Sequence, residues 1–341
     1  MHMADSLLSP AVGTAMCAVS AAAVAFSVAK IRKDDLCEKK IPLIAVMGAF
    51  VFAAQMINIT IPGTGSSGHI GGGILLSAML GGMPALLAIS SVLIIQCLFF
   101  ADGGLLALGC NIFNMGVIPC LIVYPLVFRP LVKKGFTPGR TSAGSIAASV
   151  LALQLGAFAV VFETLLSGIT VLPFRTFLLM MQPIHLGIGI IEGIASAAVL
   201  CFVHKMRPEI MESTFQRTAV RSSVPVKNVL IVLAVITLLA GGVLSLFVSS
   251  NPDGLEWSIK KITGAAELKT EYPLMEGAAA IQQKTALLPD YNFRRADEDS
   301  HSGTTIAGLA GGAFVLVLSG ISVLVISLVK KRNQQLRGKP Q

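Results

Sequence analysis

The chain has 341 residues, of which 54% are hydrophobic and only 13% are charged, and its mean hydropathy is +0.78. Because a soluble domain carries about 25% charged residues, this composition excludes an ordinary soluble globule and indicates an integral membrane protein. The formal net charge is +8, but the basic residues lie in short segments between apolar runs, so they predict membrane orientation rather than nucleic-acid binding. The six cysteines show no C-x-x-C spacing, which argues against a disulfide framework or a thiolate metal site.

The first apolar run covers residues 9–29 and is followed by Lys30, Arg32 and Lys33. A cleaved secretory signal carries its positive charge before the apolar run, whereas here nothing basic except His2 precedes it. We therefore expect an uncleaved first helix whose amino end lies outside the membrane.

Apolar runs separated by basic clusters predict an all-α integral membrane protein of about nine transmembrane helices, with the amino terminus outside and the carboxyl terminus inside. The predicted spans cover approximately residues 9–29, 41–61, 70–82, 85–100, 111–128, 143–167, 184–204, 228–248 and 304–329. The run 70–82 is too short to cross lipid alone, but without it the basic cluster that begins at Arg129 would lie outside. We therefore expect a short helix that its neighbours shield, preceded by an external loop.

A basic break separates two predicted modules. Residues 1–206 are predicted to form a seven-helix module, 207–227 an internal linker, and 228–332 a two-helix module. The second module contains the only sizeable soluble segment, 250–303, which is expected outside. This segment has nine acidic against six basic residues, too weak an excess to store metal ions, so we expect it to contact the first module.

Met1 and His2 together can form a metal chelate. The terminal amine, the backbone nitrogen of His2 and its imidazole offer three nitrogens at three corners of a square, and a second imidazole would complete it. Four nitrogens in a plane are what Ni(II) and Cu(II) prefer. His69, predicted on the same outer side, is the candidate for the fourth corner. The alternatives are a start-site accident for His2 and an ordinary polar loop residue for His69.

The loop before His69 contains the segment Gly63–Gly68, which matches G-x-G-x-x-G. A dinucleotide site needs this motif inside a βαβ unit, whereas membrane helices flank it here, so that function is rejected. The glycines instead allow the backbone to pass close to a small ligand. The chain has no phosphate-binding G-x-x-x-x-G-K-[ST] motif, so ATP hydrolysis by the chain itself is not expected.

Ionisable side chains within the predicted spans are costly and are therefore functional candidates. Glu163, His185 and Glu192 are of this kind, and His185 and Glu192, seven residues apart, share a helix face. Together with Asn114, these residues are predicted either to orient a metal-bound imidazole or to form a purely structural polar network. The same network would include Asn58, Asn111 and Gln154. Two alternatives use these groups: a proton-coupled secondary transporter with Glu163 and Glu192, and, least supported, a membrane enzyme with Asp102 and His185.

Several segments resemble the CbiM/NikM family, the substrate-capture subunits of energy-coupling-factor transporters for cobalt and nickel. They are Met1–Asp5, the glycine-rich loop ending at His69, Asn111–Gly116 and Gln182–Glu192. The resemblance covers residues 1 to about 206. The segment Pro252–Glu256, with its two flanking helices, resembles the NikN accessory module. Family members often show Ile-Pro after the histidine, where this chain has Met3-Ala4.

The resemblance implies a substrate-binding subunit in a bacterial or archaeal cell membrane. It would work with a transmembrane coupling subunit and paired ATP-binding subunits. The resemblance also implies metal ligation by the Met1 amine, by the backbone nitrogen and imidazole of His2, and by His69, in agreement with the chelate argument. Ni(II) is the expected cargo, with Co(II) as the alternative, and no nucleic-acid partner is expected.

Overall fold

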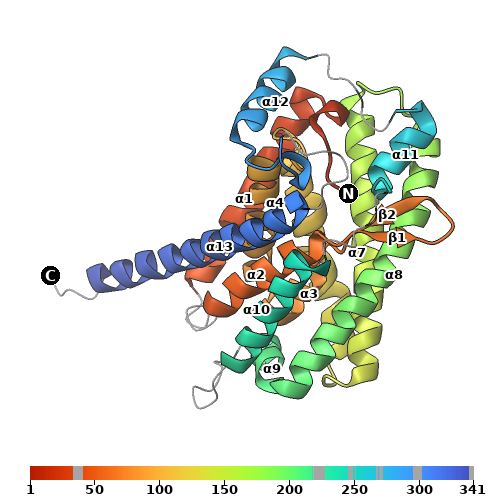
Figure 1. Ribbon diagram of the computed structural model, residues 1–341. Helices are drawn as coiled ribbons and strands as arrows, with labels where there is room; N and C mark the ends of the chain where they lie inside the picture. Colours follow the sequence, from red (N-terminus) through yellow and green to blue (C-terminus); the bar gives the residue numbers. More distant parts are fainter. Residues whose placement is uncertain are drawn as a thin grey trace.

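The structure is a computed structural model that describes residues 1–33, 41–216, 218, 227–244, 249, 251–265, 268, 272–294 and 302–337. These residues are almost entirely helical (Figure 1). Six helical segments are long and apolar enough to cross a membrane: α1 (Pro10–Arg32), α4 (Gly82–Phe100), Leu108–Val132, α7 (Pro138–Ser167), α8 (Phe174–Met206) and Gly303–Lys330 within α13 (Ser302–Arg337). Shorter apolar helices are α2 (Ile41–Gln55), α3 (Gly73–Leu80) and α10 (Lys227–Gly242). The all-α membrane class is therefore confirmed, while the number of crossings and their orientation stay predictions.

The segment Leu108–Val132 is one continuous helical run built of α5 (Leu108–Ile112), η3 (Phe113–Phe128) and α6 (Arg129–Val132). Its middle part, η3, has the wider π-type hydrogen bonding and contains Pro119 and Pro125. Since proline has no N–H to donate, regular α-helical bonding cannot continue through these positions.

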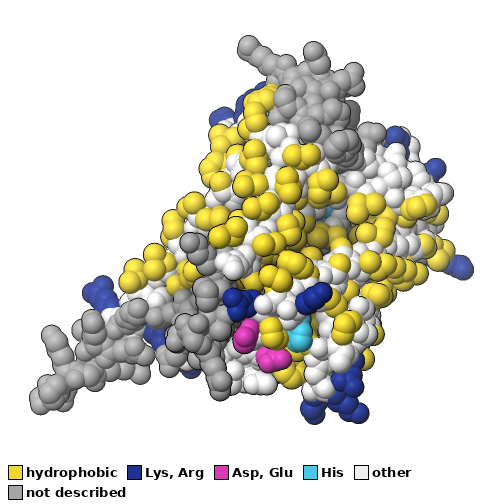
Figure 2. Space-filling view, turned by 60° about the horizontal axis from the view of Figure 1, so that its bottom comes forward, with side chains coloured by type: hydrophobic (Ala, Val, Ile, Leu, Met, Phe, Trp, Pro, Cys, Tyr) yellow, Lys and Arg dark blue, Asp and Glu magenta, His cyan; other side chains and the backbone are white. Residues whose placement is uncertain are grey.

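Helices α7 and α8 form a long antiparallel pair on one side of the molecule (Figure 1). Their outer faces carry large exposed apolar side chains such as Phe158, Phe162 and Ile194, and apolar side chains spread widely over the face seen in Figure 2. Helix α3 is the opposite case, because every one of its residues is buried. A helix too short to span lipid is thus surrounded by protein, as expected for the run 70–82.

The predicted second span is too long at its carboxyl end. Helix α2 stops at Gln55, and the segment expected to continue it forms strand β1 (Ile59–Ile61), which pairs antiparallel with β2 (Ser66–Gly68). The residues of β1 are β-branched and favour extended backbone. Gly63 and Gly65 take positive φ values of 76° and 73° in the turn between the strands. The G-x-G-x-x-G segment therefore forms the turn of a β-hairpin and its second strand.

Helix α8 begins at Phe174, earlier than the expected residue 184, so Pro183 lies inside a helix and not in an external segment. Proline in a helix interior costs about 3 kcal/mol, but α8 packs along almost the whole of α7. Reciprocal bonds cross this contact: Gln154 Nε2 donates to Gln182 O at 2.8 Å, and Gln182 Nε2 donates to Gln154 O at 3.2 Å. The packing between α7 and α8 thus outweighs the tendency of Pro183 to break a helix.

The predicted linker 207–227 begins with a helix, α9 (Pro208–Gln216). The Thr214 hydroxyl bonds to Met79 O at 2.9 Å, so this helix packs against the end of α3. Residues 217 and 219–226 of the linker lie outside the described residues.

The segment 250–303 of the second predicted module contains α11 (Gly254–Thr263), α12 (Pro273–Thr285) and the short helix η5 (Pro289–Tyr291). All three lie near the amino-terminal end of the chain (Figure 1). The expected contact with the first module is confirmed. Ser67 N donates to Pro252 O at 2.8 Å, and Trp257 Nε1 donates to Thr64 O at 3.0 Å.

Candidate metal-binding site

The amino-terminal segment is anchored just behind its first two residues. Met3 N donates to Asn111 Oδ1 at 2.7 Å, and Met3 O accepts from Asn111 Nδ2 at 3.2 Å. Met3 O also accepts from Gly104 N at 2.9 Å, and Asp5 Oδ1 accepts from Ala107 N at 2.8 Å. Burial raises the pKa of Asp5, although its bonds to backbone N–H groups partly oppose this. These bonds fix where Met1 and His2 can lie.

The loop that carries His69 is held by Glu192. Gly71 N and Gly72 N donate to its two carboxylate oxygens at 2.7 and 3.0 Å. His69 Nδ1 lies 3.1 Å from Ile70 O; since a carbonyl can only accept, Nδ1 carries the hydrogen and the Nε2 lone pair is available for a metal ion. Burial, helped by the positive amine of Met1, lowers the pKa of His69 to about 4. The imidazole is therefore neutral near pH 7.

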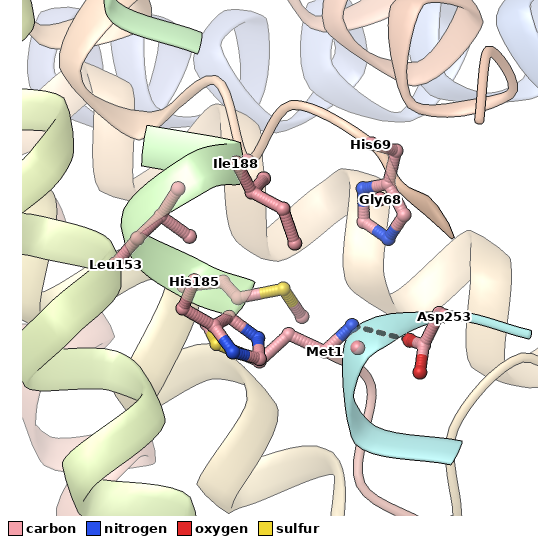
Figure 3. A pocket seen from close by; sticks show the side chains of 10 residues that line it. Met1, Gly68, His69, Leu153, His185, Ile188 and Asp253 are labelled. Carbon is pink, nitrogen blue, oxygen red and sulfur yellow. Dashed lines mark hydrogen bonds and ion pairs between the residues drawn. The ribbon is translucent and has the colours of Figure 1, made fainter. Parts of the chain in front are cut away.

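The structure brings the three predicted ligand residues together. The rings of His2 and His69 lie with their centroids 5.3 Å apart and their planes 28° apart. Two imidazoles bound to one ion at about 2 Å per metal–nitrogen bond have centroids roughly 4.5 to 6.5 Å apart, depending on the angle between them. Met1 and His69 also line the same small pocket (Figure 3). Small side-chain movements would therefore bring both imidazoles to one ion.

Carboxylates stand next to the terminal nitrogens. The Met1 amine donates to Asp253 Oδ2 at 2.6 Å, and His2 Nδ1 lies 3.2 Å from Asp102 Oδ1. Burial by itself would raise the pKa of Asp253, but the positive amine beside it holds the pKa well below its usual range. Burial lowers the pKa of His2, and Asp102 opposes this shift. On its other side, His2 Nε2 lies 3.1 Å from Gln96 Oε1.

Asp253 comes from the second module and is positioned by its own helix. As the amino-terminal cap of α11 it accepts from Leu255 N at 2.8 Å and Glu256 N at 2.9 Å through Oδ1, which leaves Oδ2 for the amine. Gly254 lies against His185, where an added Cβ would come within 3.0 Å of His185 Cε1. Neither Asp253 nor Gln96 is among the residues that the sequence pattern predicts for the site. For Asp253 a signal existed, because Asp-Gly-Leu-Glu has the spacing of a capping box.

The four interior candidates lie near the site and bond mainly to groups other than its two imidazoles. Glu163 Oε2 accepts from Asn114 Nδ2 at 2.8 Å. His185 Nδ1 lies 2.8 Å from Met181 O, and the ring lines the same pocket as Met1 (Figure 3). Glu192 holds the backbone of the loop, as described above. Within the described residues, none of these four side chains hydrogen-bonds to His2 or His69.

Comparisons with known proteins cover almost the whole chain. The family model described as the cobalt uptake substrate-specific transmembrane region, CbiM, matches residues 2–210, and the PDGLE domain matches residues 227–328. A fused nickel transport protein of the NikMN type from Archaeoglobus fulgidus is 30% identical over 319 residues, covering 93% of this chain and 96% of that protein. The fused nickel transport protein NikMN of Rhodobacter capsulatus is 34% identical over 62% of this chain and 64% of its own.

A solved structure shares the fold of 64% of the chain. The crystal structure of a transition metal transporter superposes with a TM-score of 0.54 at 26% sequence identity, over 64% of this chain and all of that one.

Proposed function

Because the chain belongs to the CbiM family and carries a PDGLE domain after the family region, we propose that it captures Ni(II) for an ATP-driven energy-coupling-factor importer. It is a multi-pass cell-membrane protein and a component of nickel or cobalt transport. The alternative of a membrane enzyme is wrong, because the homologues are metal transport proteins. Asp102 and His185, the residues considered for it, contact His2 and Met181 respectively.

The observation that carries the proposal is the meeting of Met1, His2 and His69 from distant parts of the chain. The Met1 amine, the His2 backbone nitrogen, His2 Nδ1 and His69 Nε2 would form the plane around the ion. Binding displaces protons from the amine, the amide and the imidazole of the amino-terminal chelate, so affinity should rise with pH. His69, with a pKa of about 4, should contribute nothing to that rise above pH 6.

The choice of Ni(II) over Co(II) rests on ligand geometry. Four nitrogens in a plane suit Ni(II), whereas Co(II) tolerates five or six ligands; the cobalt description of the family keeps Co(II) as the alternative. X-ray absorption of the loaded protein separates the two: a four-nitrogen planar site supports nickel as the cargo, and a five- or six-coordinate site supports cobalt.

The coupling and ATP-binding subunits are proposed from the family likeness and from the absence of a phosphate-binding loop motif in the sequence. Uptake by vesicles that contain this chain but no ATP-binding subunit would contradict this part of the proposal and favour a proton-coupled secondary transporter.

The terminal-amine ligand requires Met1 to be the first residue of the mature chain, which intact-mass measurement checks. The test is a Gly-Ser extension before Met1, with the same extension after Gln341 as the control. A two-residue extension is preferred because a single added residue would make the histidine third in the chain and create a different all-nitrogen chelate. We expect the amino-terminal extension to abolish bound nickel, as His2→Ala and His69→Ala should, without lowering Tm. Normal nickel content in the extended protein would refute the amine ligand.

A further inference from the structure

A chain of side-chain amides connects the loop behind His69 to the imidazole of His2. Gln55 Nε2 on α2 donates to Gly71 O at 2.9 Å, and Gln96 Nε2 on α4 donates to Gln55 Oε1 at 2.7 Å. His2 Nε2 then lies 3.1 Å from Gln96 Oε1. Both glutamines are buried, with exposed fractions of 5% and 1%. Such buried amides make strong demands on the direction of every hydrogen bond.

The direction of every hydrogen bond in this amide relay follows from the first bond, between Gln55 and Gly71. A backbone carbonyl can only accept, so Gln55 must turn its NH₂ group to Gly71 and its oxygen to Gln96. Gln96 must then donate its NH₂ group to that oxygen and present its own oxygen to His2. Because this oxygen also only accepts, His2 Nε2 must carry a hydrogen. In the neutral imidazole the lone pair is then on Nδ1.

Nδ1 is the nitrogen that the proposed chelate needs. It lies nearer the backbone of its own residue, so it can reach an ion bound to the His2 backbone nitrogen, whereas Nε2 lies on the far side of the ring. Nδ1 faces Asp102 Oδ1 at 3.2 Å, and Tyr291 donates its hydroxyl hydrogen to the other oxygen of Asp102. Nδ1 can donate to this carboxylate only while the ring carries a second proton. An ion that binds at Nδ1 would displace that proton and leave the Nε2 hydrogen in place.

The end of the amide relay that lies away from His2 is also fixed. Gly71, whose carbonyl accepts from Gln55, donates its N–H to Glu192 at 2.7 Å. The relay therefore begins at backbone that Glu192 holds in place, close to His69, and ends at His2. It ties the orientation of the His2 ring to the position of the loop that supplies the second imidazole.

We propose that Gln55 and Gln96 are positioning residues for metal capture, which select the His2 tautomer with its lone pair on Nδ1 and hold that ring toward the ion. The proposal rests on the amino-terminal site proposed above. Neither glutamine contacts the ion; each acts through His2, as hydrogen-bond partners of metal-bound histidines commonly do by fixing tautomer and ring direction.

The test compares Gln55→Leu, Gln96→Leu and the double variant in nickel titrations of the purified full chain. Each single change should weaken nickel binding by about 10- to 100-fold. The double variant should bind no more weakly than the weaker single variant, because cutting the relay at either link frees the same ring. Gln154→Leu is the matched control: it removes another glutamine of a long apolar helix, whose side chain donates to Gln182 O, and should leave affinity unchanged.

A spectroscopic measurement separates positioning from a merely structural role. Planar Ni(II) with four nitrogen ligands is diamagnetic, so nitrogen NMR of histidine-labelled, nickel-loaded protein can follow the five histidines. A hydrogen-bonded, slowly exchanging Nε2–H of His2 is expected in the wild type and should exchange rapidly in Gln96→Leu. A wild-type His2 signal in that variant, or lowered Tm with unchanged affinity, would overturn the proposal.

The outcomes also separate this proposal from the function on which it rests. If the Gly-Ser extension leaves nickel binding intact, both proposals fail. If the extension abolishes binding while both leucine variants bind like the wild type, or if their losses add in the double variant, only the relay is refuted.

Discussion

The two segments that supply the proposed ligands are held in place by different means. The terminal segment Met1–Asp5 depends on side chains far along the chain, because its bonds reach Asn111 and Asp253, 108 and 252 residues away. The loop 59–73 builds its own hairpin by local backbone pairing, and its distant contacts include Glu192 and the backbone of Pro252. The terminal segment is therefore the more vulnerable half of the site, because Met1 and Met3 have no strand pairing of their own and are held by bonds to distant residues.

Asn111→Ala should produce the largest loss among side chains that do not touch the ion. It leaves the buried N–H of Met3 without its partner, which costs about 1 to 3 kcal/mol, and frees the segment that carries both terminal nitrogens. We expect nickel binding to weaken by about 100-fold in calorimetric titration. Asn111→Asp keeps the oxygen that accepts from Met3 N and loses only the NH₂ group that donates to Met3 O. Its nickel affinity should therefore lie between those of the wild type and Asn111→Ala. Equal affinity of Asn111→Ala and wild type would contradict the anchoring role.

Glu192→Gln tests the loop side of the comparison. One of the two backbone N–H groups would then face an NH₂ group instead of an oxygen. The resulting shift of the loop should weaken nickel binding by about 10- to 30-fold. The same titration on Glu192→Ala should show a larger loss. If Glu192→Gln exceeded Asn111→Ala in effect, the ranking of the two segments would be reversed.

Asp253→Asn tests what the second module contributes to the terminal segment. Asparagine caps a helix about as well as aspartate, so α11 should stay intact while the ion pair with the Met1 amine is lost. Nickel affinity should fall by about 10-fold because the amine is no longer oriented. Glu256→Gln is the control, since it weakens the capping box without touching the amine. A larger effect of Glu256→Gln would show that α11 acts through its stability alone.

Glu163→Gln should have the smallest effect, about twofold or less on nickel affinity. Its carboxylate bonds to Asn114, and it makes no hydrogen bond to either ligand-bearing segment within the described residues. Metal titration and vesicle uptake should both stay near wild type. A strong loss of uptake with normal binding would instead indicate a role for Glu163 in translocation.

Composition and local pattern were enough to predict the membrane class and to name the ligand candidates. Apolar length and basic flanks are local properties, and the chelating power of Met1 and His2 follows from their adjacency alone. The short buried helix α3 could also be anticipated, because membrane parity demanded a crossing where the apolar run was too short.

Only the tertiary structure decided which distant groups meet at those ligands. Pro183 lies inside a helix because the packing of α8 along α7 outweighs the loss of one backbone hydrogen bond. This packing energy comes from residues far apart in the sequence, so the residues around Pro183 do not predict it. Asp253, Gln55 and Gln96 reach the site from three different helices or helix ends. A hydrogen-bonded relay depends on distances and angles between segments far apart in the chain, so its members look like ordinary polar residues until the fold brings them into line.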